Sequence, residues 1–223
     1  MKAIIFGATG MVGQGVLREC LRDPAVTDVL VVGRTRIDAE HPKLKQLVHR
    51  DLAELMARDD TQEQMSGYDA CFFNLGVSSF RMTEDDYRRV TYDLTLTVAR
   101  ALSAWNPGLT FVYVSGRGTD STEKGRVMWA RVKGRTENDL LALPMNTYLF
   151  RPGYIQPLHG IRSKTRLYRA LYVVAVPLFP VIRRLAPEQV TTTEQLGRAM
   201  INVATDGAPV SHLETKDINK AAA

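Results

Sequence analysis

Short apolar runs alternate along the chain with longer segments in which apolar residues recur at helical spacing. The runs predict strands over Lys2–Phe6, Asp28–Val32, Leu47–His49, Ala70–Asn74, Thr110–Ser115 and Thr147–Arg151. The segments between them predict helices that begin near Met11, Leu52, Thr83 and Lys124. Because strands that alternate with helices form parallel sheets with crossover helices, we predict an α/β fold with a doubly wound parallel sheet of the Rossmann type.

The sequence also marks where several helices begin and end. Asp51 comes directly before the Leu52 segment, and Glu54 stands three residues later, which predicts an N-cap with a capping box. Asp23 and Pro24 end the first helix. A last amphipathic helix is predicted within residues 191–206.

The strict alternation of strands and helices ends after Arg151. Pro152, Gly153 and Pro157 follow it closely and predict a loop. We therefore predict a single nucleotide-binding domain over residues 1–223, with a core over residues 1–155 and a small carboxy-terminal substrate or lid lobe over residues 156–223. A chain of 223 residues is long enough to bury a core without metal or disulfide staples.

Composition adds one feature to this picture, which is the position of the charge. The formal net charge is +5, with 45% hydrophobic and 24% charged residues. The stretch between His159 and Pro187 contains no Asp or Glu and six basic residues: Arg162, Lys164, Arg166, Arg169, Arg183 and Arg184. The rest of the chain is close to neutral, so we expect a small-molecule substrate, apolar or anionic, and no nucleic-acid partner.

This basic segment also carries the longest apolar run of the chain, over residues 170–182, interrupted by Pro177 and Pro180. One interpretation is a helix pair that covers the substrate cleft or forms the seam of a homodimer. The other is a peripheral membrane contact, because a short apolar element with flanking cations can lie in a lipid interface. No run of 18 apolar residues occurs, so the sequence predicts no helix that spans a membrane.

The cysteines and histidines show no pattern of their own. Cys20 and Cys71 both have apolar neighbours and are predicted to be buried thiols of a reducing compartment, so a cytoplasmic location is expected, with peripheral membrane association as an alternative. His41, His49, His159 and His212 do not combine with these cysteines at metal-ligand spacing, and no metal site is predicted.

Three glycines directly follow the first predicted strand and open the first predicted helix. Gly7, Gly10 and Gly13 stand in the order that a strand–turn–helix phosphate site requires. One glycine permits the sharp turn, another lets the backbone approach a pyrophosphate, and the last lets the helix pack on the sheet. The spacing differs from GxGxxG, but the context favours a dinucleotide over a plain tight turn.

The end of the second predicted strand indicates which dinucleotide is bound. Arg34 and Arg36 stand there, and the first acidic residue is Asp38. A carboxylate at the strand end would hold the ribose hydroxyls of NAD, whereas an arginine accommodates the 2′-phosphate of NADP. The sequence thus favours NADP(H) over NAD(H), with solvated loop charges as the alternative interpretation of both arginines.

Eight motifs in order make the chain similar to a known family. They read GATGMVG, VGR, HRDL, FFNLG, VTYDLTLTVARAL, FVYVSGRG, ARVKGRTEN and FRPGYIQP, and together they extend over most of the chain. In this order the set resembles the atypical short-chain dehydrogenase/reductases, and more closely the NAD(P)-binding, epimerase-like proteins that include the Tat-interacting oxidoreductase group.

The resemblance implies a role for each matching position. The cofactor-binding residues it implies are Gly7, Thr9, Gly10, Met11, Val12 and Gly13 at the pyrophosphate, Arg34 at the 2′-phosphate, Asp51 and Leu52 at the adenine, Leu75 and Gly76 at the middle of the cofactor, Lys133 at the nicotinamide ribose, and Pro152 and Gly153 beside the ring. The catalytic residues it implies are Lys133 and Ser115.

The chain departs from the family pattern at the proton donor. The family has Tyr four residues before the catalytic Lys, whereas Trp129 stands four residues before Lys133. An indole N–H does not ionise in a useful range, so ordinary ketone reduction is expected to be slow or absent. Tyr113 and Tyr154 are candidate replacement acids.

Two functions from different classes follow from this departure. One is an NADP(H)-dependent oxidoreductase or sugar-epimerase-like enzyme, which the retained Lys133 and Ser115 favour. The other is a redox-inactive NADP(H) sensor or interaction protein, which Trp129 favours.

Overall fold

The computed structural model describes residues 1–161, 184 and 187–223. The basic and apolar segment, for which a cleft cover, a homodimer seam or a membrane contact is expected, lies outside the described residues, apart from its end at Arg184. Within the described ranges, none of the helices combines the length and the apolar character that crossing a membrane requires.

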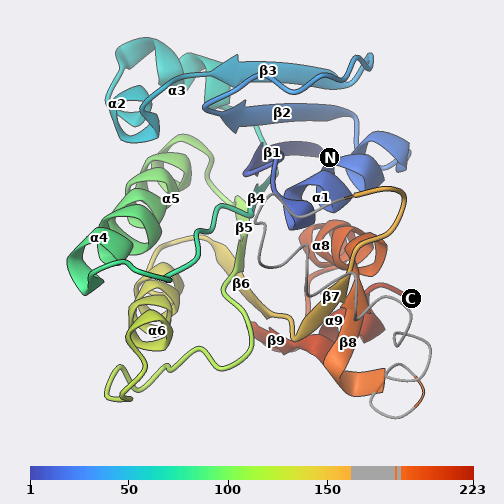
Figure 1. The fold of residues 1–223 in the computed structure, drawn as a ribbon. Helices are drawn as coiled ribbons and strands as arrows, with labels where there is room; N and C mark the ends of the chain where they lie inside the picture. The colour runs from blue at the N-terminus through green and yellow to red at the C-terminus, as the bar shows by residue number, and fades with distance from the viewer. Residues whose placement is uncertain (162–183, 185–186) are drawn as a thin grey trace.

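A seven-stranded parallel sheet forms the centre of the molecule (Figure 1). Its order is β3-β2-β1-β4-β5-β6-β9. The strands are β1 (Lys2–Phe6), β2 (Asp28–Gly33), β3 (Leu44–Val48), β4 (Ala70–Phe73), β5 (Thr110–Val114), β6 (Asn146–Arg151) and β9 (His212–Glu214). All six neighbouring pairs are parallel, and the strand order reverses between β1 and β4. This topology confirms the predicted doubly wound Rossmann-type sheet.

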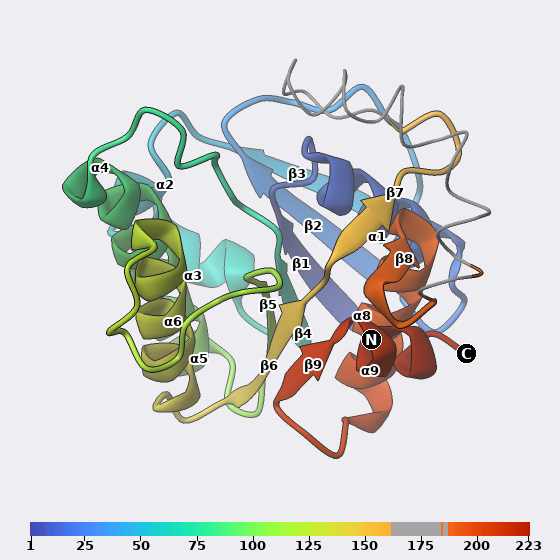
Figure 2. The same cartoon turned by 60° about the horizontal axis from the view of Figure 1, so that its bottom comes forward.

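Helices cover both faces of the sheet (Figures 1 and 2). One face carries α1 (Met11–Arg22), α8 (Thr193–Asp206) and α9 (Thr215–Ala221). The other face carries α2 (Leu52–Met56), α3 (Asp59–Met65), α4 (Glu84–Arg88), the π-helical turn η1 (Arg89–Asp93), α5 (Leu94–Trp105) and α6 (Met128–Leu141). The protein is therefore a three-layer α/β structure.

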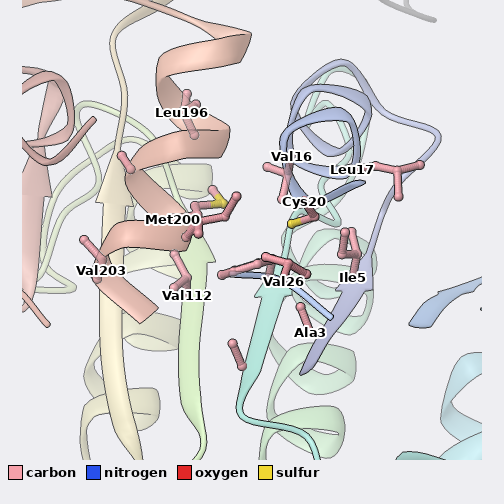
Figure 3. Packing of buried hydrophobic residues seen from close by; sticks show 14 of the residues in the cluster. Ala3, Ile5, Val16, Leu17, Cys20, Val26, Val112, Leu196, Met200 and Val203 are labelled. Carbon is pink, nitrogen blue, oxygen red and sulfur yellow. The ribbon is translucent and has the colours of Figure 1, made fainter. Parts of the chain in front are cut away.

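Alternation along the strands divides the core into two clusters. Ala3 and Ile5 of β1 pack toward α1 and α8, and Ile4 and Phe6 pack toward the opposite layer. Figure 3 shows the first cluster, in which Val16 and Cys20 of α1 lie beside Met200 of α8. Because both faces of the sheet are covered, β4 and the central residues of β1, β2 and β5 are apolar on both faces, as the strand prediction requires.

Most predicted elements begin and end within a few residues of the observed ones, and two differ by more. The third strand is predicted over Leu47–His49 but is β3, over Leu44–Val48. It is a half-exposed edge strand, so Lys45 and Gln46 interrupt its apolar pattern. The helix predicted to start near Lys124 begins at Met128, because the Asp120 carboxylate accepts hydrogen bonds from the Thr122 and Gly125 amides and holds this stretch in turns.

The structure confirms two predicted helix starts, but not the capping box expected at Asp51 and Glu54, because the Asp51 amide donates to the His49 ring instead of the Glu54 carboxylate. Asp51 caps α2 by accepting hydrogen bonds from the amides of Ala53 and Glu54. Thr83 caps α4 by accepting one from the amide of Asp86.

The part of the chain after residue 155 divides between two places. Parallel strands β7 (Tyr154–Gln156) and β8 (Val190–Thr192) form a separate two-stranded sheet, preceded at β8 by the 3₁₀ turn η2 (Pro187–Gln189). In contrast, α8 packs on α1, and β9 pairs with β6 at the edge of the main sheet. The sequence pattern does not predict these three-residue strands, which are too short to show a period. The division at residue 155 stays a prediction.

Candidate functional site

Two cavities lie at the carboxyl ends of the parallel strands. The first, the β1–β2 cavity, has a volume of about 350 Å³ and is lined by Gly7, Ala8, Thr9, Val31, Val32, Gly33, Arg34, Thr35, Leu52 and Leu75. The second, the α6 cavity, has a volume of about 410 Å³ and is lined by Val77, Ser78, Ser79, Tyr87, Ser115, Gly116, Arg117, Trp129, Lys133, Pro152 and Gly153. In open α/β sheets, ligands bind at this edge, where the strand order reverses.

The turn between β1 and α1 depends on glycine at two positions. Gly7 has φ +78°, and a Cβ there would lie 2.7 Å from the carbonyl carbon of Asn74 at the end of β4. A Cβ on Gly13 would lie 2.1 Å from the carbonyl oxygen of Gly7. The turn is therefore tight enough to place the start of α1 against the carboxyl ends of β1 and β4.

The start of α1 has the properties of an anion site. Gly10 is its N-cap and offers no side-chain hydrogen bond, and the first turn contains no acidic residue. The first amides of a helix have no intrahelical partner, and the helix dipole places partial positive charge there. The backbone at Met11, Val12 and Gly13 is thus suited to an oxygen-rich anion such as a pyrophosphate.

The β1–β2 cavity brings together five of the residues assigned to the cofactor: Gly7, Thr9, Arg34, Leu52 and Leu75. Arg34 is exposed at its wall. Gly10, Met11, Val12 and Gly13 form the adjacent turn, whereas Asp51 and Gly76 do not line this cavity, and the Asp51 carboxylate caps α2. The cofactor role of all these residues stays a prediction.

The α6 cavity brings together four further assigned residues, which are Ser115, Lys133, Pro152 and Gly153, whereas Asp51 and Gly76 line neither cavity. The Lys133 ammonium donates a hydrogen bond to the backbone carbonyl of Ser115, joining α6 to the end of β5. Ser115 is buried, and its hydroxyl donates to the carbonyl of Phe150 at 3.2 Å. The Ser115 hydroxyl oxygen can therefore still accept a hydrogen bond from a ligand in the cavity.

The electrostatics of Lys133 differ from those of an exposed lysine. Burial disfavours its charged form and lowers its pKa to about 8, and the carboxylate of Glu137 opposes the change in part. Glu137 lies on the same helix and is fully buried, and it forms an ion pair with Arg151 of β6. An amine with a pKa this close to neutral can exchange protons at physiological pH.

Trp129 lies in the wall of the α6 cavity and shares a face of α6 with Lys133. A Cβ on Gly118 would be 3.5 Å from its ring, so the indole also packs against the loop after β5. Indole has one N–H donor and no acceptor. Trp129 can therefore orient a bound molecule but cannot supply the ionisable hydroxyl of a tyrosine.

Neither tyrosine named as a replacement acid lines the cavity. Tyr113 is buried in the core beside Phe73, and burial raises the pKa of its hydroxyl far above the usual value. The Tyr154 hydroxyl donates to Gln156 at 2.9 Å. Among the described residues, the tyrosine that lines the cavity is Tyr87 of α4, which is 2% exposed.

Tyr87 and Arg117 are cavity residues that no sequence pattern indicates. Tyr87 stands alone among the charged residues of Glu84–Arg88, where no apolar period shows which side chain points inward. Arg117 follows Ser115 by two residues in a loop without any pattern. In the sequence, only its proximity to Ser115 indicates that Arg117 belongs to the site, and nothing indicates Tyr87.

These features define a class of protein: a Rossmann-type α/β protein with the fold of the short-chain dehydrogenase/reductases. A solved short-chain dehydrogenase/reductase family oxidoreductase from Burkholderia thailandensis matches with a TM-score of 0.70 and 16% identity, over 99% of this chain and 92% of its own. The enzyme WbmH from Bordetella bronchiseptica, solved in complex with NAD+, matches with a TM-score of 0.65 and 16% identity, over 96% of this chain and 75% of its own. The chain matches no known protein-family profile.

The sequence relatives are more specific, and they include FMP52 and HTATIP2 proteins. Protein FMP52-2, mitochondrial, from Scheffersomyces stipitis is 26% identical over 95% of this chain and 90% of its own length. FMP52, mitochondrial, from Debaryomyces hansenii is 29% identical over 74% of this chain and 70% of its own. HTATIP2 from Rattus norvegicus is 26% identical over 68% of this chain and 61% of its own. These homologues confirm the resemblance to atypical short-chain dehydrogenase/reductases.

The relatives correct the expected location. Two buried, unpaired cysteines predict a cytoplasmic protein, but the matched FMP52 proteins of both yeasts are named mitochondrial. Buried reduced thiols therefore do not identify the compartment, because they depend on burial and reducing conditions alone.

Proposed function

We propose that this protein binds a nicotinamide dinucleotide along the carboxyl edge of the sheet and acts as an oxidoreductase or epimerase-like enzyme in the α6 cavity. The observation that carries the proposal is the arrangement of the two cavities. The β1–β2 cavity has the glycine turn, the free amides at the start of α1 and Arg34. The α6 cavity has Lys133, which is hydrogen-bonded to the backbone at the end of β5. The NAD+ complex of WbmH, which shares this fold, supports the choice of cofactor.

The residues present fit the cofactor. Gly7 and Gly13 leave no room for a Cβ, so the backbone at the pyrophosphate position is fixed by the turn itself. Leu52 and Leu75 give the β1–β2 cavity apolar walls for the adenine end of the cofactor. Pro152 and Gly153 line the α6 cavity. A bound nicotinamide dinucleotide would supply or accept the hydride.

We propose NADP(H) as the preferred form, because Arg34 is exposed at the wall of the β1–β2 cavity and no acid precedes Asp38 after the second strand. A guanidinium binds the extra phosphate by charge-assisted hydrogen bonds, but solvent weakens an exposed pair. NADPH should therefore bind about tenfold more tightly than NADH, at the low end of the range for such contacts.

Fluorescence titration of both cofactors tests this preference. Arg34→Ala should remove it, whereas Arg36→Ala, an exposed arginine outside the lining of the cavity, should retain it. Equal affinities in the wild type, or a preference that survives Arg34→Ala, would contradict the assignment.

In the α6 cavity, this chain's own residues would divide the work of carbonyl reduction. Lys133 would orient the nicotinamide ribose and keep an ammonium close to the reacting oxygen. Ser115 would accept or donate a hydrogen bond at that oxygen. Because Trp129 stands where the family has its tyrosine, turnover of simple carbonyls is expected to be low.

A second candidate function is a redox-inactive dinucleotide sensor, which the cavity position of Trp129 favours. NADPH consumption over a panel of carbonyl compounds separates the two. Low turnover that rises in Trp129→Tyr and is lost in Lys133→Met supports the enzyme. Cofactor binding with no turnover in either the wild type or Trp129→Tyr supports the sensor.

A further inference from the structure

The α6 cavity has an unbalanced charge. Its lining contains two cations, Arg117 and Lys133, and no aspartate or glutamate among the described residues. Lys133 has the Ser115 carbonyl as its partner and lies near Glu137. Arg117 is the cation to which the proposed function assigns no role.

The backbone holds Arg117 at the cavity by two means. Its neighbours Gly116 and Gly118 have φ of +114° and +86°, which L side chains rarely adopt, so the loop reverses sharply around it. Its amide donates to the carbonyl of Pro152 at 3.0 Å, which ties the loop after β5 to the loop after β6. The side chain thus starts from a fixed point in the wall of the cavity.

The partner of the guanidinium is neutral. Arg117 donates a hydrogen bond to the side-chain oxygen of Gln189, and among the described residues no carboxylate lies within ion-pair distance of it. Residues 160–186 contain no Asp or Glu, so the part of the chain that is not described has no carboxylate to offer either. By contrast, Arg131 is paired with Glu84 and Arg151 with Glu137.

An exposed guanidinium with one neutral partner keeps four of its five N–H donors and its whole charge for a ligand. Carboxylate and phosphate groups match this donor geometry. Two aromatic residues line the same cavity: Trp129 of α6, which is partly exposed and offers apolar surface for the rest of the ligand, and Tyr87 of α4, which is almost fully buried.

We propose that Arg117 is a substrate-binding residue that recognises an anionic group, carboxylate or phosphate, on a carbonyl compound whose apolar part packs against Trp129 and Tyr87. The carbonyl would lie between this group and Lys133. The substrate class rests on the proposed oxidoreductase function, whereas the anion site itself rests on the charge and geometry of the cavity alone.

Equilibrium binding without cofactor tests the site, because no turnover can occur. The probes are 4-formylbenzoate, its neutral methyl ester and 4-formylphenyl phosphate, titrated by calorimetry. We expect at least one anion to bind about tenfold more tightly than the ester, with a preference that falls as salt rises. The carboxylate and phosphate arms show which group the site takes.

Matched variants assign the preference to one residue. Arg117→Gln should abolish it, Arg117→Lys should retain part of it, and Arg100→Gln, an exposed arginine on α5, should leave it unchanged. A preference that persists in Arg117→Gln, or the absence of charge-dependent binding in the wild type, would overturn the proposal.

The two proposals fail separately in these experiments. Anion binding that depends on Arg117, in a protein that never oxidises NADPH, would refute the oxidoreductase and leave the anion site. Turnover of neutral carbonyls with no gain for anionic ones would retain the oxidoreductase and refute the role of Arg117.

Discussion

Lys133 has its amino group in surroundings where a positive charge is costly. Its pKa falls from 10.5 to about 8, so between these values the unfolded chain holds a proton that the folded protein has lost. Stability contributed by this residue therefore rises with pH across that interval. At pH 7 the folded protein carries the cost of the buried charge.

Replacing Lys133 by Met should thus stabilise the cofactor-free protein at pH 7. The gain should be at most about 3 kcal/mol, the equivalent of the pKa change, and smaller where the lost bond to the Ser115 carbonyl matters. The difference from wild type should shrink as pH rises from 8 to 10.5. Urea unfolding at a series of pH values measures it, and a pH-independent difference would show that the buried charge is not its cause.

A second prediction at the residue scale concerns the hydroxyl of Tyr87. Its side chain lines the α6 cavity beside Lys133 and Trp129, which those of Tyr113 and Tyr154 do not, and we expect its hydroxyl to supply the proton. If the protein turns over carbonyls, Tyr87→Phe should lower kcat by about 10²-fold or more, the usual loss of a positioned acid. Tyr154→Phe is the control and should leave kcat unchanged.

At the scale of elements, helices α1 and α8 pack closely because each has a glycine that faces the other helix. A Cβ on Gly15 would lie 2.6 Å from the carbonyl oxygen of Thr193, and one on Gly197 would lie 2.7 Å from the Glu19 side chain. Gly15→Ala must therefore push the helices apart.

We expect Gly15→Ala to cost about 1–3 kcal/mol of stability, as overpacking does elsewhere. Gly76→Ala is the control, since a Cβ there meets nothing within 4 Å and its φ is not positive. Chemical denaturation of both variants makes the comparison. Equal midpoints would show that the two helices can separate at no cost.

A buried ion pair joins α6 to β6. Arg151 donates from Nε to the fully buried carboxylate of Glu137 at 3.0 Å, and this pair raises the pKa of the guanidinium. Arg151→Met would leave Glu137 buried without its main partner, with the His212 ring 3.8 Å away. The expected cost is about 3–5 kcal/mol.

Two further variants test that interpretation of the pair. Arg58→Met removes an exposed partner of Asp60 and should not change stability measurably. The double variant Arg151→Met with Glu137→Leu should regain most of the loss, because neither charge of the pair is then left buried without its partner. Failure of the second change to restore stability would assign the loss to packing around the Arg151 stem.

The sequence predicts elements well where burial imposes a period, and less well where burial is partial. The inner strands β1, β2, β4 and β5 are found because both faces are covered. The edge strand β3 is misplaced, and the three-residue strands β7 to β9 are missed. The same limit applies to the site: the glycine turn has a local pattern, whereas Tyr87 and Arg117 reach the cavity only through tertiary packing.

At the scale of the whole molecule, the two cysteines lie in the two apolar clusters on opposite faces of the sheet. Cys20 lies in the cluster between the sheet and α1, and Cys71 lies in the cluster on the opposite face. Both are fully buried, and burial raises the pKa of each far above its usual value. Neither should react with a thiol reagent in the folded protein.

Labelling with Ellman's reagent therefore measures opening of each layer. In mild denaturant, Cys20→Ala and Cys71→Ala, each with one remaining thiol, should react at equal rates if both layers unfold as one unit. Faster reaction of either thiol would show that its layer opens alone.

The packing of α1 against α8 also has a consequence for synthesis. The apolar face of α1 is complete when Arg22 leaves the ribosome, but the helix that covers it ends at Asp206. At about 5–20 residues per second, roughly 10 to 40 s pass between the two. During that time the nascent chain presents an uncovered apolar helix next to an incomplete sheet, so this protein should depend on chaperones during translation more than a protein whose neighbouring helices are close in sequence.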